Sequence, residues 1–96
     1  MLVQLKKLNI INEGFNKTSI TLDKVYVNPS HIISIIDYEG AREFLLREGS
    51  LGNKSDRFSL VRISMANKVE EMIVLGTSEQ VFSQIQTRPK KDLLNG

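Results

Sequence analysis

The chain has 96 residues, of which 41% are apolar, and it carries a formal net charge of +2. This length suffices for one domain with one hydrophobic core and is too short for two domains with separate cores. Because cysteine is absent, disulfides, thiolate nucleophiles and cysteine-based zinc sites are excluded, which fits a reducing compartment.

Location and oligomeric state follow from the same features. No apolar run approaches the roughly 18 residues that a membrane span needs, and the first charges follow the first apolar residues, so we expect neither membrane insertion nor secretion. The cytoplasm is therefore the expected location. A chain this short buries a modest share of its surface, so self-association would add stability and a homodimer is slightly favoured over a monomer.

The first apolar stretch, residues 1–11, contains two sets of strand-like positions that are out of phase. Val3 and Leu5 form one set, and Leu8 and Ile10 form the other. We favour a strand with a bulge or break near Lys6 and Lys7. After a turn at 12–14, residues 20–27 indicate one strand, or two short strands interrupted at 23–24.

The corner Asn-Pro-Ser-His, residues 28–31, separates this stretch from the next strand. Pro29 fixes φ and favours extended geometry at Asn28, whose side chain is placed to cap the turn. His31 is the only histidine, and it lies outside the apolar pattern, so we expect it at the surface rather than as a ligand or pH sensor. Residues 32–36 are rich in β-branched side chains, which predicts a strand buried on both faces.

Residues 38–57 admit two interpretations. One is a hairpin that turns at 39–40 and returns through 44–46. The other is a short helix over 41–48, supported by good helix formers and by Gly49 in the C-cap position. We slightly prefer the hairpin, because the preceding strand needs a neighbour. Residues 49–56 are expected to form a flexible loop.

The last third of the chain has the clearest signals. Residues 58–65 and 69–75 predict an antiparallel hairpin with its turn at 66–68, and apolar residues on both faces of the second strand indicate a central or covered strand. Thr77 and Gln80 have the spacing of a capping box, so a helix should begin here. Val81, Phe82 and Ile85 form a stripe that can lie on the sheet, and Pro89 ends the helix.

These elements predict an α+β, mainly β fold. We expect an antiparallel meander or a small, partly open barrel of about five strands with one short C-terminal helix. A single domain would span 1–88, followed by a flexible basic tail at 89–96.

Catalysis and cofactor binding find little support in the residues. One histidine cannot form a two-histidine metal site, and no phosphate-binding GxxxxGK[ST] spacing is present. The neighbouring acids at 37 and 39 flank a turn, and those at 70 and 71 point to opposite faces of a strand. We therefore expect a protein that is not an enzyme and binds no cofactor or metal.

Residues 42–68 carry six basic side chains against three acidic ones, with aromatic residues interspersed. The candidate partner-binding residues are Tyr38, Arg42, Phe44, Arg47, Lys54, Arg57 and Arg62. The first hypothesis is a non-catalytic module that occupies a protein partner through this segment. The alternative is a regulator that binds nucleic acid, using the same basic residues with exposed rings as stacking surfaces.

Two segments carry a family resemblance. VYVNPSHIISI, with its Val-Asn-Pro-x-x-Ile-x-x-Ile pattern, and IVLGTSEQVFSQI resemble the FlbD-type small bacterial proteins associated with flagellar gene clusters. The resemblance covers residues 25–36 and 58–86. It implies a small β-meander with a C-terminal helix and a non-enzymatic regulatory or accessory role. The small size, the absence of cysteine and the inserted polar loop would equally suit a phage-encoded protein that binds and modifies a host machine.

Overall fold

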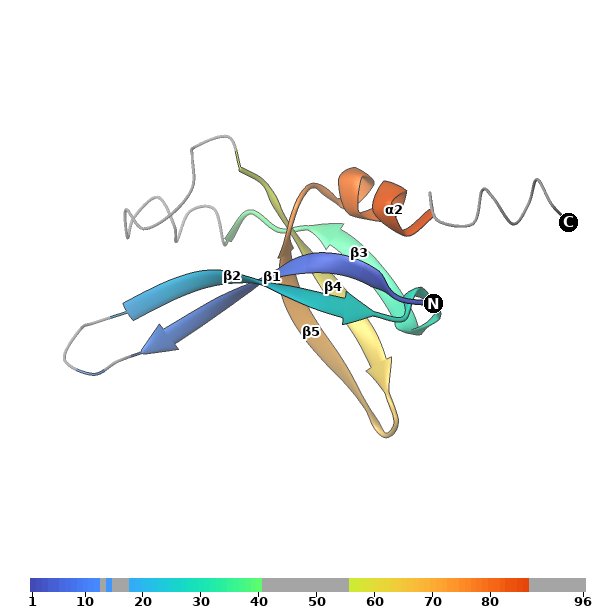
Figure 1. Ribbon diagram of the computed structural model, residues 1–96, viewed down its shortest axis with the longest axis horizontal. Helices are drawn as coiled ribbons and strands as arrows, with labels where there is room; N and C mark the ends of the chain where they lie inside the picture. The colour runs from blue at the N-terminus through green and yellow to red at the C-terminus, as the bar shows by residue number, and fades with distance from the viewer. Residues whose placement is uncertain (13, 15–17, 41–55, 87–96) are drawn as a thin grey trace, which may run out of the picture.

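The computed structural model describes residues 1–12, 14, 18–40 and 56–86. Five antiparallel strands form one open sheet, and a short helix lies against it (Figure 1). The elements are β1 (Val3–Asn12), β2 (Thr18–Val27), the 3₁₀ turn η1 (Pro29–His31), β3 (Ile32–Asp37), β4 (Phe58–Met65), β5 (Lys68–Leu75) and α2 (Ser78–Gln86). The expected mainly β fold with one short C-terminal helix is confirmed.

The strands lie in the order β2-β1-β5-β4-β3. β2 and β3 follow each other in the chain but form opposite edges of the sheet, so the connection through η1 crosses from one edge to the other. β4 and β5 form the predicted hairpin, in which Met65 pairs with Lys68. β5 lies between β1 and β4, which confirms the central position that its two apolar faces indicate.

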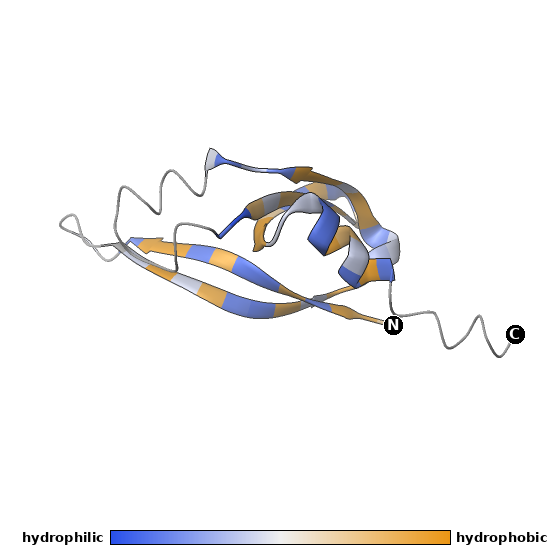
Figure 2. Ribbon diagram, turned by 90° about the horizontal axis from the view of Figure 1, so that it is seen from above, coloured by the Kyte–Doolittle hydropathy of each residue, from blue (hydrophilic) through white to orange (hydrophobic). Residues whose placement is uncertain are grey.

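The β1–β2 ribbon is continuous, and the predicted bulge near Lys6 and Lys7 is wrong. Its register runs without a shift from Val3 opposite Val27 to the far end of both strands. β2 is therefore one strand rather than two. Hydrophilic and hydrophobic residues alternate along the ribbon (Figure 2). Because side chains alternate between faces, residues three apart such as Leu5 and Leu8 point to opposite faces of an unbroken strand.

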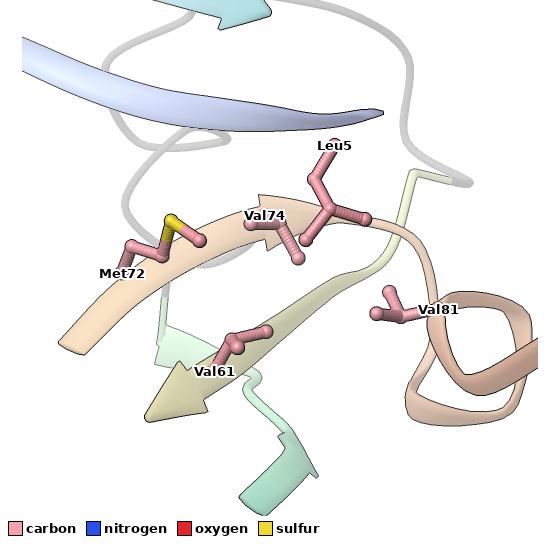
Figure 3. Packing of buried hydrophobic residues seen from close by; sticks show 5 residues of the cluster. All are labelled: Leu5, Val61, Met72, Val74 and Val81. Carbon is pink, nitrogen blue, oxygen red and sulfur yellow. The ribbon is translucent and has the colours of Figure 1, made fainter. Parts of the chain in front are cut away.

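One residue from each apolar set of β1 belongs to a core cluster, Leu5 to the first and Leu8 to the second. Figure 3 shows the side chains of the first cluster pointing toward one another from β1, β4, β5 and α2; its buried members are Leu5, Val61, Met72, Val74 and Val81. The second cluster, on the other face, is formed by buried Leu8 and Phe58 with partly buried Ile20, Leu22, Ile73 and Leu75. The apolar positions of β1 thus change phase because Leu5 and Leu8 contact clusters on opposite faces of the sheet. A bulge residue is not needed to explain the pattern.

β3 is an edge strand, and the prediction that it is buried on both faces is wrong. Ile35 packs against the first cluster, whereas Ile33 and Ile36 are exposed. The pairing with β4 shifts between Ile32 and Ser34, which leaves Ile33 as an extra residue. A bulge of this kind turns a side chain away from its regular direction. The β-branched composition thus correctly predicted a strand here, but it did not show that the strand lies at an edge of the sheet.

Helix α2 packs on the sheet with a narrower stripe than expected. Val81 is fully buried and Ile85 packs against the same cluster, as predicted. Phe82 is 51% exposed, so its predicted place on the sheet is wrong. Val81 and Ile85 are one helical turn apart and share a face, while Phe82 lies about 100° around the helix from Val81.

Three predicted segments lie wholly or almost wholly outside the described residues. These are the segment 41–48, for which a hairpin and a helix were the alternatives, the loop 49–56, of which residue 56 alone is described, and the basic tail 89–96. All three stay predictions. The described chain leaves the sheet after Tyr38, whose N–H donates to the Phe58 carbonyl at 2.9 Å, and returns at residue 56.

Candidate functional site

Of the residues expected to bind a partner, Tyr38, Arg57 and Arg62 belong to the described chain. The other four, Arg42, Phe44, Arg47 and Lys54, lie outside it. Arg62 donates from Nε to Glu71 Oε2 at 2.7 Å, and about half of each side chain is exposed. This ion pair lies on the face of the sheet opposite α2, because Val61 beside Arg62 points to the first cluster. It offsets the charge that Arg62 would present to an anionic partner.

The described members of this set are not gathered into one cluster. Tyr38 lies beyond the end of β3 and lines a shallow hollow with Leu60 and Glu71. Arg62 pairs with Ser34, four residues along the strands from Tyr38, which corresponds to about 13 Å. Arg57 precedes β4, where its carbonyl accepts from the Gly76 N–H at 2.7 Å. The structure therefore spreads these side chains over the end and the outer face of the sheet.

An apolar groove lies elsewhere, between the η1–β3 segment and helix α2. It has a volume of about 460 Å³. Its lining residues are Pro29, Ile32, Ile33, Ser34, Ile35, Ser78, Glu79, Phe82 and Ile85. Ile33 is 55% exposed and Phe82 is 51% exposed, so large apolar side chains on both walls face solvent. Exposed apolar surface gathered in a concave region is typical of a binding site.

The first wall of the groove is fixed by the corner that precedes β3. Asn28 Oδ1 accepts from the Ser30 N–H at 3.0 Å and from the Ser30 hydroxyl at 2.8 Å. Pro29 occupies the first position of η1, where no N–H is needed. The predicted cap at Asn28 is confirmed. His31 is exposed at the end of η1 and does not line the groove.

The second wall is fixed by the start of α2. Thr77 Oγ1 accepts from the Gln80 N–H at 3.1 Å, and the Thr77 N–H donates to Gln80 Oε1 at 2.9 Å. This reciprocal pair is the predicted capping box. The Ser78 N–H donates to Asp37 Oδ1 at 2.8 Å, which ties the helix to the end of β3. A carboxylate in this position also interacts favourably with the helix dipole.

Gly76 sets the direction in which the chain leaves β5 for the helix. Its φ is 117°, a backbone conformation that residues other than glycine rarely adopt. A Cβ at this position would also lie 3.4 Å from Val81 Cγ2. The Gly76 carbonyl accepts from the hydroxyl of buried Ser59 at 2.7 Å. A side chain of β4 therefore holds the residue at which the chain turns from β5 toward α2.

The charge at the groove is negative. Glu79 is the one ionisable residue among those that line it, and the Asp37 carboxylate lies beside it at the first turn of α2. The sequence prediction missed this site because Ile33 and Phe82 both fit patterns of buried residues. The only sequence signal for an exposed Phe82 was its position next to Val81, since both cannot point directly at the sheet.

The described residues contain no group of three or more His, Cys, Asp or Glu side chains placed to hold a metal ion. Among the described residues, no helix is long and apolar enough to cross a membrane. Comparison of the chain with protein-family models, with curated proteins and with solved structures finds no match. The resemblance to FlbD-type proteins therefore stays a prediction.

Proposed function

We propose that the protein is a non-catalytic binding module that acts by occupying a protein partner, with the groove between β3 and α2 as its binding surface. The observation that carries this proposal is the exposure of Ile33 and Phe82 on opposite walls of one concavity. The partner-binding residues expected from the sequence stay a prediction, and the groove is proposed beside them because it combines exposed apolar area with a concave shape.

The size of the effect can be gauged from the two exposed side chains. Full burial of a large apolar side chain contributes about 1.5–3 kcal/mol. Because Ile33 and Phe82 are each about half exposed, covering both would contribute about 1.5–3 kcal/mol in total. This corresponds to a change of about 10- to 150-fold in Kd. Removal of one of them should therefore be measurable.

The position of these residues also supports binding rather than catalysis. The polar groups along the groove are Ser34, Ser78 and Glu79, and the Ser78 N–H already donates to Asp37. A small cytoplasmic module with a rigid apolar groove suits a regulatory or accessory role, including modulation of a host machine by a phage or bacterial protein. This role agrees with the one that the FlbD-type resemblance implies.

Affinity purification of the tagged protein from its native host tests the proposal. We expect Phe82→Ser to lose a co-purifying protein that the unchanged chain retains. Ile11→Ser is a matched control, because Ile11 is 48% exposed and lies on β1, outside the lining of the groove. Retention of the same proteins by Phe82→Ser, or equal loss from both variants, would contradict the assignment of the groove.

A second candidate function, nucleic-acid binding, is favoured by a surface of the β1–β2 ribbon. Lys6 and Lys24 lie directly opposite each other, and Tyr26 is opposite Gln4, two residues along the same face. Both lysines are exposed, and neither makes an ion pair within the described part of the chain. Like charges in directly opposed positions are destabilising, and a phosphate would relieve this repulsion.

Filter binding of single- and double-stranded RNA and DNA tests this second candidate. If the ribbon binds nucleic acid, retention should fall steeply with added salt. Lys6→Gln combined with Lys24→Gln should lower the slope of log affinity against log salt concentration by the amount that corresponds to about two phosphate contacts. Tyr26→Ser should weaken single-strand binding, and Phe82→Ser should leave it unchanged. No retention at low salt would remove this candidate without affecting the groove.

A further inference from the structure

The outer edge of β3 adjoins the groove and presents unpaired backbone groups. In an antiparallel pair, alternate residues direct both their N–H and C=O toward the neighbouring strand. The Tyr38 N–H bonds to the Phe58 carbonyl directly opposite, so Ile36 and Ser34 also face β4. Ile35 and Asp37 therefore direct their backbone groups outward, where the described chain places no further strand.

The two edges of the sheet differ in how they are protected. β2 carries Asp23 and Lys24 at its centre, and Asp23 accepts hydrogen bonds from the side chains of Asn9 and Thr21. Charges of this kind discourage pairing with another strand. The sequence of β3 is Ile-Ile-Ser-Ile-Ile-Asp, which has no charge before its last residue. The bulge at Ile33 limits regular pairing to residues 34–37.

We propose that the partner of the groove is an extended segment that adds to β3 as a sixth strand. This inference rests on the proposed function and names the class of partner. Backbone hydrogen bonds to Ile35 and Asp37 would set its direction, and its alternate side chains would cover Phe82 on the α2 side of the sheet. Addition of a strand to a free edge is an established mode of peptide recognition.

The charge around the groove defines the partner further. Glu79 lines the groove, and Asp37 ends β3, while no basic side chain lies among the described lining residues. A strand with apolar residues at alternate positions and a Lys or Arg near these acids would be electrostatically complementary. An acidic strand would be disfavoured. A second copy of the chain would bring the same acidic end and is the competing occupant.

Selection of random 12-residue displayed peptides on the immobilised full chain tests this inference. We expect enriched peptides to alternate apolar and polar residues, to contain Lys or Arg, and to bind the variant Phe82→Ser about 3- to 13-fold more weakly. Addition of the best peptide to the labelled protein should slow amide exchange of Ile35 and Asp37 at least 10-fold. N-methylation of alternate peptide nitrogens should weaken binding by at least 10-fold.

The outcomes separate strand addition from the proposed function. Peptides that depend on Phe82 but tolerate N-methylation and leave exchange at Ile35 unchanged would overturn strand addition and keep the groove as a binding site. Enriched peptides with apolar residues at helical spacing would likewise overturn strand addition and keep the groove as a binding site. Absence of any enrichment that depends on Phe82 would overturn both. If amide exchange at Ile35 is slow in the protein alone and becomes slower as the protein concentration rises, a second copy occupies the edge. That result would overturn the inference.

Discussion

Two neighbouring residues of helix α2 should respond to truncation in the reverse order of their sizes. Val81 is fully buried, at 0% exposed, whereas the larger Phe82 is 51% exposed. Val81→Ala removes about two methylene equivalents, which cost about 0.8 kcal/mol each, and leaves a cavity. The better helix propensity of Ala returns about 0.5 kcal/mol. We expect a net loss of about 1.5–2 kcal/mol in the free energy of unfolding.

Phe82→Ala removes a ring that is already half in water, so the lost burial is about 0.75–1.5 kcal/mol and helix propensity again offsets part of it. The expected net loss is about 0.5–1 kcal/mol. Urea unfolding followed by far-ultraviolet circular dichroism should resolve the two variants. At about 1 kcal/mol per molar urea, their midpoints should differ by roughly 1 M. A larger loss for Phe82→Ala than for Val81→Ala would refute the assignment of the two faces.

Three further substitutions, with His31→Ala as a control, test the elements that hold the groove. Asn28→Ala should lower the free energy of unfolding by about 1 kcal/mol through the lost cap, and His31→Ala by less than about 0.5 kcal/mol; equal urea midpoints would contradict this. Ser59→Ala leaves the Gly76 carbonyl without its buried donor and should cost about 1–3 kcal/mol by thermal unfolding, unless the melting temperature is unchanged. Thr77→Ala should cost about 1 kcal/mol and speed amide exchange in the first turn of α2; unaltered exchange there would argue against the capping box.

The sequence predicted the elements whose signals are contiguous. The β4–β5 hairpin, the Asn28 corner and the start of α2 each depend on residues within a few positions of one another. In these places the local preferences and the final structure agree. The capping box is an example, because Thr77 and Gln80 satisfy each other without help from the rest of the fold.

The phase of β1 could not be decided from the sequence. A bulged strand with one buried face and a straight strand with a different buried face in each half give the same apolar pattern. The structure has the second arrangement, because Leu5 meets the first cluster and Leu8 the second. Only the position of β5 beside Lys7 reveals that a core exists on each face at this point.

The candidate site depends on a contact between distant residues. Asp37 and Ser78 are 41 residues apart, and their hydrogen bond places α2 beside β3. In the sequence, Asp37 stands close to Glu39 as one of two acids near a turn, and nothing there connects it with Ser78. Without the placement of α2, the β-branched run of β3 was interpreted as a buried strand. The groove therefore follows from tertiary structure and has no local motif.

The use of both sheet faces explains why β3 remains available. The β1–β2 ribbon covers part of one face with Val25 and Val27 and part of the other with Ile20 and Leu22. β3, at the far edge of the described sheet, pairs with β4 and has α2 packed beside it. A strand in that position would ordinarily be shielded by charge or proline to prevent uncontrolled pairing. β3 instead has aliphatic residues beside a groove in which Glu79 is the one ionisable lining residue. An apolar edge strand next to a negatively charged groove therefore agrees with the proposed addition of a partner's strand.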